Sequence, residues 1–385
     1  MTQVKRYEGK PFSFRVAIQG RGLLMLTRTN FAPEEKQLLL RFWQSAAGYW
    51  WGPSAWRAWL LVVALIANVV LQLLTQYGLN FWNRDFFNAV GRKDQAELLN
   101  QALRFVPLAG ASIGLTVYSV WARMTLQRSW RAWLSNQLYD YWLQDDRHTR
   151  LRFIAGDHEA PEYRIAEDAK VATDLPIDLV IGLLQSLLTI VTFIGILWSV
   201  GDSLTVDAGG FVLTIPGYLV LAVIAYSVLL AFGIWLTAGQ LTRVIEENKR
   251  MEADLRAIGT HVRESGEGTA LLDTKSSARH AVGSALKAVI GVWRIYCWQL
   301  MRMTLVTYTS LLITPVIGLL LCLPKYLVDT MTLGEVVQAS AAFVVVQTAF
   351  NWFTDNYAKL AEWTASANRV ASLLLALDED HSRSP

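Results

Sequence analysis

The stretch LTRVIEENKRMEADLRAIGTHVRE, residues 241–264, decides the fold that this sequence predicts. It follows an apolar block at 211–238 without a helix breaker, and it consists of helix-forming residues with many charges. A helix that leaves a membrane and continues over this length projects on the order of 30 Å from the bilayer, at about 1.5 Å per residue. We therefore expect a long helix that runs from the membrane into the cytoplasm.

The rest of the chain repeats this alternation of apolar and charged blocks. Of its 385 residues, 53% are hydrophobic and only 17% are charged, which argues against a soluble globular protein. A bilayer core needs roughly 20 mostly apolar residues per helix. Six blocks meet this requirement, namely 57–80, 103–122, 176–200, 211–238, 303–323 and 333–354. The N-terminal residues lack the apolar core of a signal peptide, so we expect no removable leader.

The placement of Lys and Arg predicts the orientation of these spans. Basic residues gather in two long regions, 123–175 and 239–300, whereas the short connection 201–210 contains none. Positive charge marks the cytoplasmic side of a membrane protein. We therefore expect a multi-pass protein with both long regions and both termini in the cytoplasm.

Each long basic region is predicted to form a helical hairpin. Residues 126–144, LQRSWRAWLSNQLYDYWLQ, continue helical spacing out of the second span, as 241–264 do after the fourth. Break regions with Gly, Pro, Asp and Ser follow at 152–163 and 264–277. The predicted fold class is an all-α membrane protein with six long spans and two cytoplasmic helical hairpins.

The domain boundaries follow from the same pattern. Residues 1–54 form a cytoplasmic N-terminal segment, 55–377 the six-helix membrane domain and 378–385 a polar C-terminal tail. Within the first segment, 33–51 begins with Pro and acidic residues, which favour a helix N-terminus. This elbow helix either lies along the membrane interface or packs as an ordinary helix.

Four motifs carry a resemblance to a known family. They are NFWNRDFFNAV at 80–90, EAPEYRIAEDAKVATDLPIDL at 159–179, ENKRMEADLRAIGTHVRESGEGTALL at 247–272 and TDNYAKLAEWTASANRVASL at 354–373. In this order they resemble the membrane domain of SbmA/BacA-like and YddA-like transporters, over about 35–377. The resemblance implies the ABC exporter-type fold, a domain-intertwined homodimer and the bacterial inner membrane. Glu162 and Tyr163 depart from the pattern of the ATPase-bearing relatives, and 264–275 lacks their aromatic pair.

The resemblance leaves the energy source open. The sequence has no G-x-x-x-x-G-K-[ST], the loop whose backbone N–H groups cradle phosphates, so we expect no ATPase activity in this chain. The leading hypothesis is proton-coupled transport of peptides or similar amphipathic cargo by alternating access. The alternative is the permease half of an ATP-binding-cassette transporter whose ATPase is absent or separate. A third hypothesis is a receptor or scaffold that does not transport.

No cofactor, metal or nucleic-acid partner is expected; the expected partners are a second copy, the lipid bilayer, peptide-like cargo and an ATPase. Cys297 and Cys322 are neither paired as CxxC nor close to clustered His residues, which argues against a zinc site or a disulfide framework. We expect both cysteines to be small buried hydrophobic residues.

Four carboxylates are candidates for proton coupling. Moving a carboxylate towards a low dielectric raises its pKa, as a proton carrier near neutral pH requires. Glu167, Asp168 and Asp178 lie at or just before the start of the third span, and the resemblance favours Glu167. Glu252 matches a Glu of the family motif through its MEAD stretch. The alternative is that they are helix-end acids paired with Arg164 or Lys170, or residues of a solvated helix face.

Polar and aromatic residues near the spans are candidates for the cargo cavity. Asn68, Gln72 and Gln76 follow at four-residue steps and share one face of the first span with Asn80. Such a stripe must face protein or water, so it lines the cargo path or forms a helix-packing seam. The aromatic candidates line the cavity or belong to the interfacial belt. They are Trp82, Phe86, Trp352 and Tyr357.

Overall fold

The computed structural model describes residues 33–52, 55–144, 147–150, 161–208, 211–238, 241–266 and 272–383. Within these ranges six helices are long and apolar enough to cross a membrane, which confirms the predicted number of spans. The predicted cytoplasmic segment before residue 33, most of the break region 152–163 and the centre of 264–277 lie outside the described residues.

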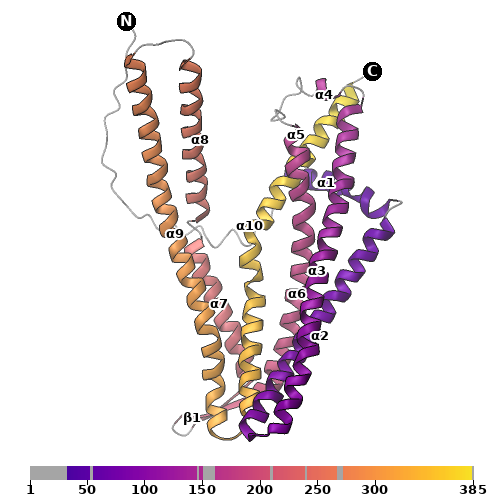
Figure 1. The fold of residues 1–385 in the computed structure, drawn as a ribbon, viewed down its shortest axis with the longest axis vertical. Helices are drawn as coiled ribbons and strands as arrows, with labels where there is room; N and C mark the ends of the chain where they lie inside the picture. The colour runs from indigo at the N-terminus through magenta and orange to yellow at the C-terminus, as the bar shows by residue number, and fades with distance from the viewer. Residues whose placement is uncertain are drawn as a thin grey trace.

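Long helices make up nearly all of the structure (Figure 1). Six helices carry the spans, and α1 and α8 are the other long helices. Three short turns complete the helical part of the described residues, namely α4 (Arg147–Arg150), α5 (Pro161–Tyr163) and the π-helical turn η3 (Arg164–Asp168). The long helices are α1 (Pro33–Trp51), α2 (Ala55–Arg92), α3 (Gln95–Leu143), α6 (Ala169–Gly201), α7 (Tyr218–Ala238), α8 (Leu241–Gly266), α9 (Leu272–Leu327) and α10 (Leu333–Arg383). The predicted helix at 33–51 is confirmed, whereas α10 continues through 378–383, where the sequence predicted a tail.

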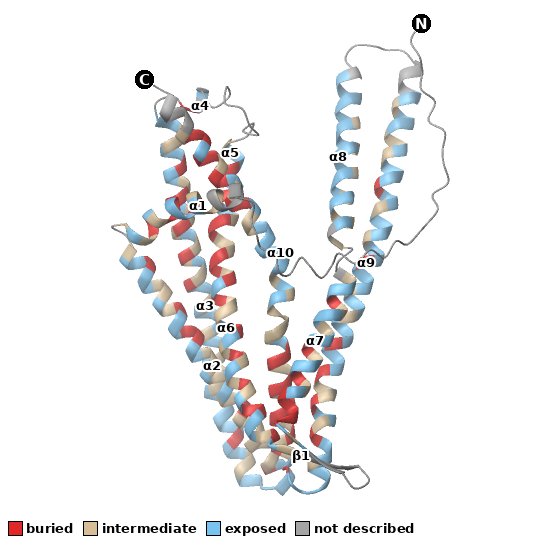
Figure 2. Ribbon diagram, turned by 180° about the vertical axis from the view of Figure 1, so that it is seen from behind, coloured by how far each residue is buried: buried red, intermediate tan, exposed pale blue. Residues whose placement is uncertain are grey.

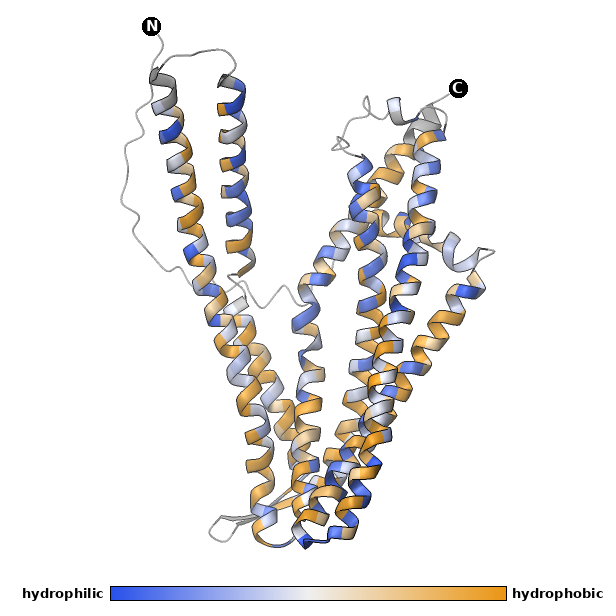
Figure 3. Ribbon diagram, in the orientation of Figure 1, coloured by the Kyte–Doolittle hydropathy of each residue, from blue (hydrophilic) through white to orange (hydrophobic). Residues whose placement is uncertain are grey.

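The helices converge at one end of the molecule and diverge at the other (Figure 1). At the diverging end, α3 with α6 and α8 with α9 extend as two helical pairs, which confirms the predicted hairpins. With 56 residues, α9 is about 84 Å long at 1.5 Å per residue, far more than a bilayer core of about 30 Å. Figure 3 shows α8 as largely hydrophilic beside the hydrophobic α7, so the hairpins extend beyond the apolar part. That this end lies in the cytoplasm stays a prediction.

Short connections close the converging end. Asp94 caps α3 by accepting hydrogen bonds from the backbone N–H groups of Ala96 and Glu97. At the start of α10, the Thr332 hydroxyl and the Glu335 carboxylate form a reciprocal capping box. These caps satisfy N–H groups that the first helical turns leave unpaired, and they fix where both helices begin.

A β-hairpin replaces part of the predicted fourth span. Strand β1 (Ser203–Ala208) pairs antiparallel with β2 (Phe211–Pro216), with Leu204 opposite Ile215. The prediction of a span beginning at 211 was therefore wrong, because α7 begins only at Tyr218. Both strands are rich in apolar and β-branched residues, which favour strands, and two glycines separate them in the sequence, which is a turn signal.

Two further expectations are corrected. The fourth span was predicted to continue unbroken into the hairpin, but α7 ends at Ala238 and α8 begins at Leu241. Gly239 follows Ala238 in the sequence, and glycine is the usual residue after a helix end. Cys322 is buried as expected, whereas Cys297 is exposed, because α9 packs on α8 along this stretch and leaves its other faces uncovered.

The core consists of two clusters at different heights (Figure 2). The first joins α1, α2, α3, α6 and α10 near the diverging end and includes Phe42, Trp130 and Leu373. The second joins α6, α7, α9 and α10 near the β-hairpin and includes Phe193 and Phe343. Helix α10 contributes to both clusters, so it connects the arm formed by α7, α8 and α9 to the rest of the chain.

Candidate functional site

An ion pair between a buried carboxylate and a half-exposed arginine joins the start of α6 to the far part of α10. Arg369 donates two hydrogen bonds to the Asp168 carboxylate, from Nε at 2.9 Å and from Nη2 at 2.6 Å. The Asp168 side chain is only 4% exposed. Nearby, Arg164 Nη1 donates to the Ser372 hydroxyl at 2.9 Å. Asp168 and Arg164 both belong to η3, and π-helical turns are frequent at functional sites. We call Asp168, Arg369, Arg164 and Ser372 the η3–α10 clamp.

The structure separates the four proton-coupling candidates. Asp168 is buried in the η3–α10 clamp, whereas Glu167 beside it is exposed. Asp178 lies about three turns further along, in α6, where it accepts a hydrogen bond from Gln127 at 2.9 Å and forms an ion pair with Arg123 at 3.3 Å. Glu252 is exposed on α8 and accepts a hydrogen bond from Asn248. Asp168 is thus paired with Arg369, and not with Arg164 or Lys170 as the sequence suggested.

The polar stripe of α2 divides between packing and exposure. Asn80 is buried and donates to the carbonyl of Gln338 on α10 at 3.1 Å. Gln72 donates to the carbonyl of Leu115 on α3 at 3.1 Å, while Gln76 is exposed. Asn68 is buried, and neither of its amide atoms has a hydrogen-bond partner among the described residues. The stripe is therefore part of the helix packing at Gln72 and Asn80 and is exposed at Gln76.

This contrast gives a prediction for two matched substitutions. Asn68→Leu should raise the free energy of unfolding by about 1 kcal/mol, because it removes a buried amide that makes no hydrogen bond. Asn80→Leu should lower it by less than about 1 kcal/mol, because it removes the hydrogen bond from the Asn80 amide to the Gln338 carbonyl but also removes the Asn80 Oδ1, which has no partner in the described residues. Thermal unfolding in detergent measures both. If both variants shift the midpoint in the same direction, the partners assigned to these two amides are wrong.

The aromatic candidates lie at two heights along the helices. Near the converging end, Trp82 donates from its indole N–H to the carbonyl of Gln101 at 2.8 Å and stacks on Phe86 at 5.1 Å between ring centroids. On α10, the Trp352 indole packs directly on Gly182 of α6, where a Cβ atom would lie 2.7 Å from Nε1. Tyr357 is 71% exposed on α10, which runs between the two diverging arms in Figure 1.

A second clamp fastens the end of α10 to two other helices. Arg41 of α1 donates to the Asp378 carboxylate from Nε at 2.8 Å and from Nη2 at 3.0 Å, and the Tyr141 hydroxyl of α3 donates to it at 2.6 Å. These hydrogen bonds hold the pKa of the Arg41 guanidinium above its ordinary value. Sequence reasoning missed this clamp, because 337 residues separate Arg41 from Asp378 and no local spacing connects them.

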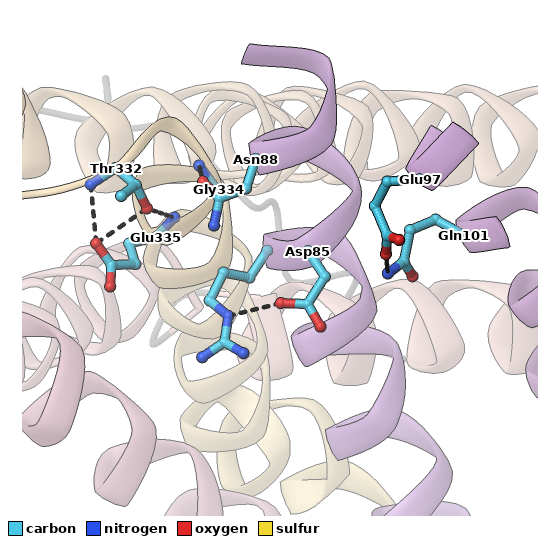
Figure 4. A network of polar contacts seen from close by, with 8 residues as sticks. Asp85, Asn88, Glu97, Gln101, Thr332, Gly334 and Glu335 are labelled. Carbon is cyan, nitrogen blue, oxygen red and sulfur yellow. Dashed lines mark hydrogen bonds and ion pairs between the residues drawn. The ribbon is translucent and has the colours of Figure 1, made fainter. Parts of the chain in front are cut away.

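A polar network holds the converging end together (Figure 4). The N–H of Gly334 donates to the Asn88 side chain at 2.9 Å, which ties the start of α10 to the end of α2. Arg84 pairs with its neighbour Asp85 at 2.9 Å, and Gln101 donates to Glu97 within α3. A Cβ atom at Gly334 would collide with the carbonyl oxygen of Arg84, so the close approach of these helices depends on glycine.

The arrangement can separate two sides of a membrane. One end is closed by Asn88, Gly334 and the helix caps, and the other end has two diverging arms connected through α10 (Figure 1). Both clamps fasten α10 to the arm that contains α1, α3 and α6. A change in the distance between the arms would therefore act on α10. No group of side chains that could hold a metal ion occurs in the parts of the chain that the structure describes.

Comparison with known proteins agrees with this geometry. The model of the family described as ABC transporter transmembrane region 2 matches residues 51–327. The inner membrane ABC transporter ATP-binding protein YddA of Escherichia coli is 29% identical over 322 residues, which cover 81% of this chain and 56% of that protein. An uncharacterized ABC transporter ATP-binding protein of Synechocystis is 25% identical, over 84% of this chain and 47% of its own length.

A plant protein shows the same partial coverage. ABC transporter D family member 2, chloroplastic, of Arabidopsis thaliana is 20% identical over 93% of this chain and 48% of its own length. The chain therefore spans about half the length of the curated relatives it matches.

Proposed function

This chain belongs to the ABC transporter transmembrane region 2 family, and on that premise we propose that it forms the membrane pathway of a transporter that works by alternating access. The observation that carries the proposal is the difference between the two ends of the fold. The helices are tied together at one end by the Asn88–Gly334 hydrogen bond and diverge at the other into two helical hairpins. Moving the arms together while releasing the tied end would expose the pathway to the other side.

ATP supplied by another domain or chain is the energy source that the comparisons favour. The relatives from Escherichia coli and Synechocystis are named as ATP-binding proteins, and this chain matches about half of each. The chain itself has no phosphate-binding loop, so we propose that it binds cargo and changes shape but does not hydrolyse ATP. The tips of the two hairpins are the ends through which such a partner would act.

A homodimer is part of the proposal. The arm formed by α8 and α9 leaves large apolar side chains uncovered, including Trp293, Trp298 and Leu305. Exposed apolar patches of this kind mark surfaces that contact protein or lipid. In the part of α9 beyond the apolar span, a second copy of the chain would cover this surface. The bacterial inner membrane and cytoplasmic termini belong to the same proposal.

Peptide cargo is the finer part of the proposal, and proton coupling is its alternative energy source. Glu167 is exposed to water, and it adjoins Asp168 of the η3–α10 clamp. Protonation of Glu167 would change the charge next to that clamp. The large aromatic side chains exposed on α10, Phe353 and Tyr357, suit amphipathic cargo. This is the SbmA/BacA-like form of the hypothesis.

Transport assays in liposomes distinguish the two energy sources. Purified protein should accumulate a labelled amphipathic peptide under an imposed pH gradient if protons drive it, and Glu167→Gln should bind the peptide without concentrating it, because Gln keeps the shape but cannot titrate. Glu252→Gln tests the second exposed carboxylate in the same assay. If the parent protein responds only when an ATP-binding partner and ATP are added, the ATP-driven form stands and proton coupling is wrong. If neither condition gives transport, the transporter proposal itself is wrong.

A further inference from the structure

A tryptophan-lined pocket lies between α1, α2, α3 and α6, and none of its lining residues belongs to either clamp or to the cargo candidates. Its volume is about 370 Å³, within the range of about 300–1,000 Å³ that is usual for ligand pockets. Every residue that lines it is apolar or aromatic. Five of them are tryptophans, namely Trp43, Trp50, Trp51, Trp59 and Trp130. We call this the tryptophan pocket.

The tryptophan pocket has a buried floor and an exposed rim. On the floor, Trp130 is 1% exposed, and Leu126 and Ile177 are also buried. On the rim, Trp51 is 80% exposed and Val180 is 64% exposed. Val180 and Trp59 belong to two of the six helices that can cross a membrane. The mouth of the pocket is therefore continuous with the apolar surface that these spans present to lipid.

A basic residue, Arg57, lies at the start of α2, two residues before the lining residue Trp59 but on another face of that helix. Arg57 is exposed, its guanidinium is 5.4 Å from the centre of the Trp56 ring, and it forms no ion pair within the described residues. Along α2, Arg57 precedes the lining residue Val62 by about 7.5 Å, at 1.5 Å per residue. Tryptophans and basic residues gather where the headgroups of a bilayer meet the acyl chains. Arg57 thus has the height along α2 of a headgroup phosphate, and its long side chain must reach around the helix to contact a lipid whose hydrocarbon chain enters the pocket.

The lining of such a pocket favours neither bound water nor an empty space. Among the buried lining residues, the indole N–H of Trp130 is the one polar group without a hydrogen-bond partner in the described residues, and a buried water needs about two to four such partners. An empty pocket would leave its lining without dispersion contacts on one side. Hydrocarbon from the adjacent leaflet can enter through the rim. We propose that the tryptophan pocket binds one acyl chain of a membrane phospholipid whose phosphate contacts Arg57, and that this lipid holds α1 against the spans. This binding site is independent of the cargo and of the energy source.

The unmodified protein provides the first test. Delipidated protein in detergent is titrated with phosphatidylglycerol brominated in mid-chain, because bromine quenches tryptophan fluorescence at short range. We expect quenching that saturates at one lipid per chain, with one bound phospholipid per chain in native mass spectrometry. Quenching that rises without saturation, together with no retained phospholipid, would overturn the proposal.

Matched variants locate the binding site. Ala47→Phe fills the pocket from α1 and should lose the bound phospholipid. Ala67→Phe adds the same side chain on an exposed face of α2 and should retain it. Arg57→Gln should lower the preference for phosphatidylglycerol over phosphatidylcholine by about fivefold, as expected for one basic residue at an anionic headgroup.

Each other outcome contradicts the proposal. If Ala47→Phe retains the lipid as the parent does, the chain binds elsewhere. If Arg57→Gln changes no headgroup preference and a brominated fatty acid binds equally well, the phosphate contact is wrong. If the labelled peptide displaces the brominated lipid from the parent protein, the pocket is a cargo site. Should Ala47→Phe fail to fold, the titration of the parent protein still decides the result.

Discussion

Replacing Arg369 with Met should lower the free energy of unfolding by about 2 kcal/mol, because the Asp168 carboxylate is buried while the Arg369 side chain is 47% exposed. The Asp168 carboxylate is 4% exposed and accepts two hydrogen bonds from Arg369. Met keeps most of the side-chain volume but leaves a buried carboxylate without its cation. Removing Arg369 is costly because the buried Asp168 carboxylate has already lost its contact with water and then loses its cation as well. The measurement is the midpoint of thermal or denaturant unfolding in detergent.

Three controls identify the cause of that loss. Glu167→Gln changes the exposed neighbour of Asp168 and should stay within about 0.5 kcal/mol of the parent, as surface substitutions usually do. Arg369→Lys keeps the charge but not the two-pronged geometry, so it should give an intermediate loss. The double variant Asp168→Leu with Arg369→Met removes both charges and should recover much of the stability. A double variant as unstable as Arg369→Met alone would contradict the assignment.

The same variant should have a functional consequence. The η3–α10 clamp fastens α10 to the start of α6, and α10 also packs on the arm formed by α7 and α9. Without the clamp, a movement of that arm would displace α10 without moving α6 with it. We therefore expect Arg369→Met to retain cargo binding and to lose transport, at temperatures where the variant is still folded. Transport equal to the parent's would show that the clamp serves stability alone.

Replacing Gly334 with Ala should disrupt the closed end of the molecule. A Cβ atom at this position would collide with the backbone carbonyl oxygen of Arg84 and lie 2.6 Å from the Asn88 side-chain oxygen. Backbone cannot move aside as a flexible side chain does, so α10 and α2 must separate and lose the Gly334–Asn88 hydrogen bond. Overpacking of this kind costs about 1–3 kcal/mol. Thermal unfolding measures the loss of stability, and transport assays should show leakage of cargo through the opened end.

Gly114 provides the matched control. It lies in the middle of α3, where a Cβ atom would meet nothing within 4 Å. Gly114→Ala should therefore leave stability unchanged or raise it by up to about 1 kcal/mol, because alanine favours a helix more than glycine does. Asn88→Ala separates the hydrogen bond from the collision, since it removes the acceptor without adding bulk. If Gly334→Ala behaves like Gly114→Ala, the closed end does not depend on the close approach of α2 and α10.

Residues close together in the sequence were the easiest to place correctly. The six apolar blocks and the charged helical stretch at 241–264 predicted the spans and both hairpins, because a bilayer requires long apolar helices and α-helical spacing is a local property. The hairpin of β1 and β2 was missed because a short apolar run such as 211–216 does not distinguish a strand from a helix. For the polar stripe, the sequence predicted that the four residues share one face of α2, but not which of their side-chain amides form hydrogen bonds.

The sequence by itself therefore determined a six-span, nearly all-helical membrane protein with two helical hairpins. Only the tertiary structure decided which side chains meet across those helices. Asp168 and Arg369 are 201 residues apart, Arg41 and Asp378 are 337 apart, and Gly334 approaches a carbonyl of a helix that ends more than two hundred residues earlier. The tryptophan pocket likewise draws its lining from four helices. The physical reason is that helical periodicity fixes which residues share a face, whereas the partner of that face depends on how long helices pack, and packing is decided by contacts between distant parts of the chain.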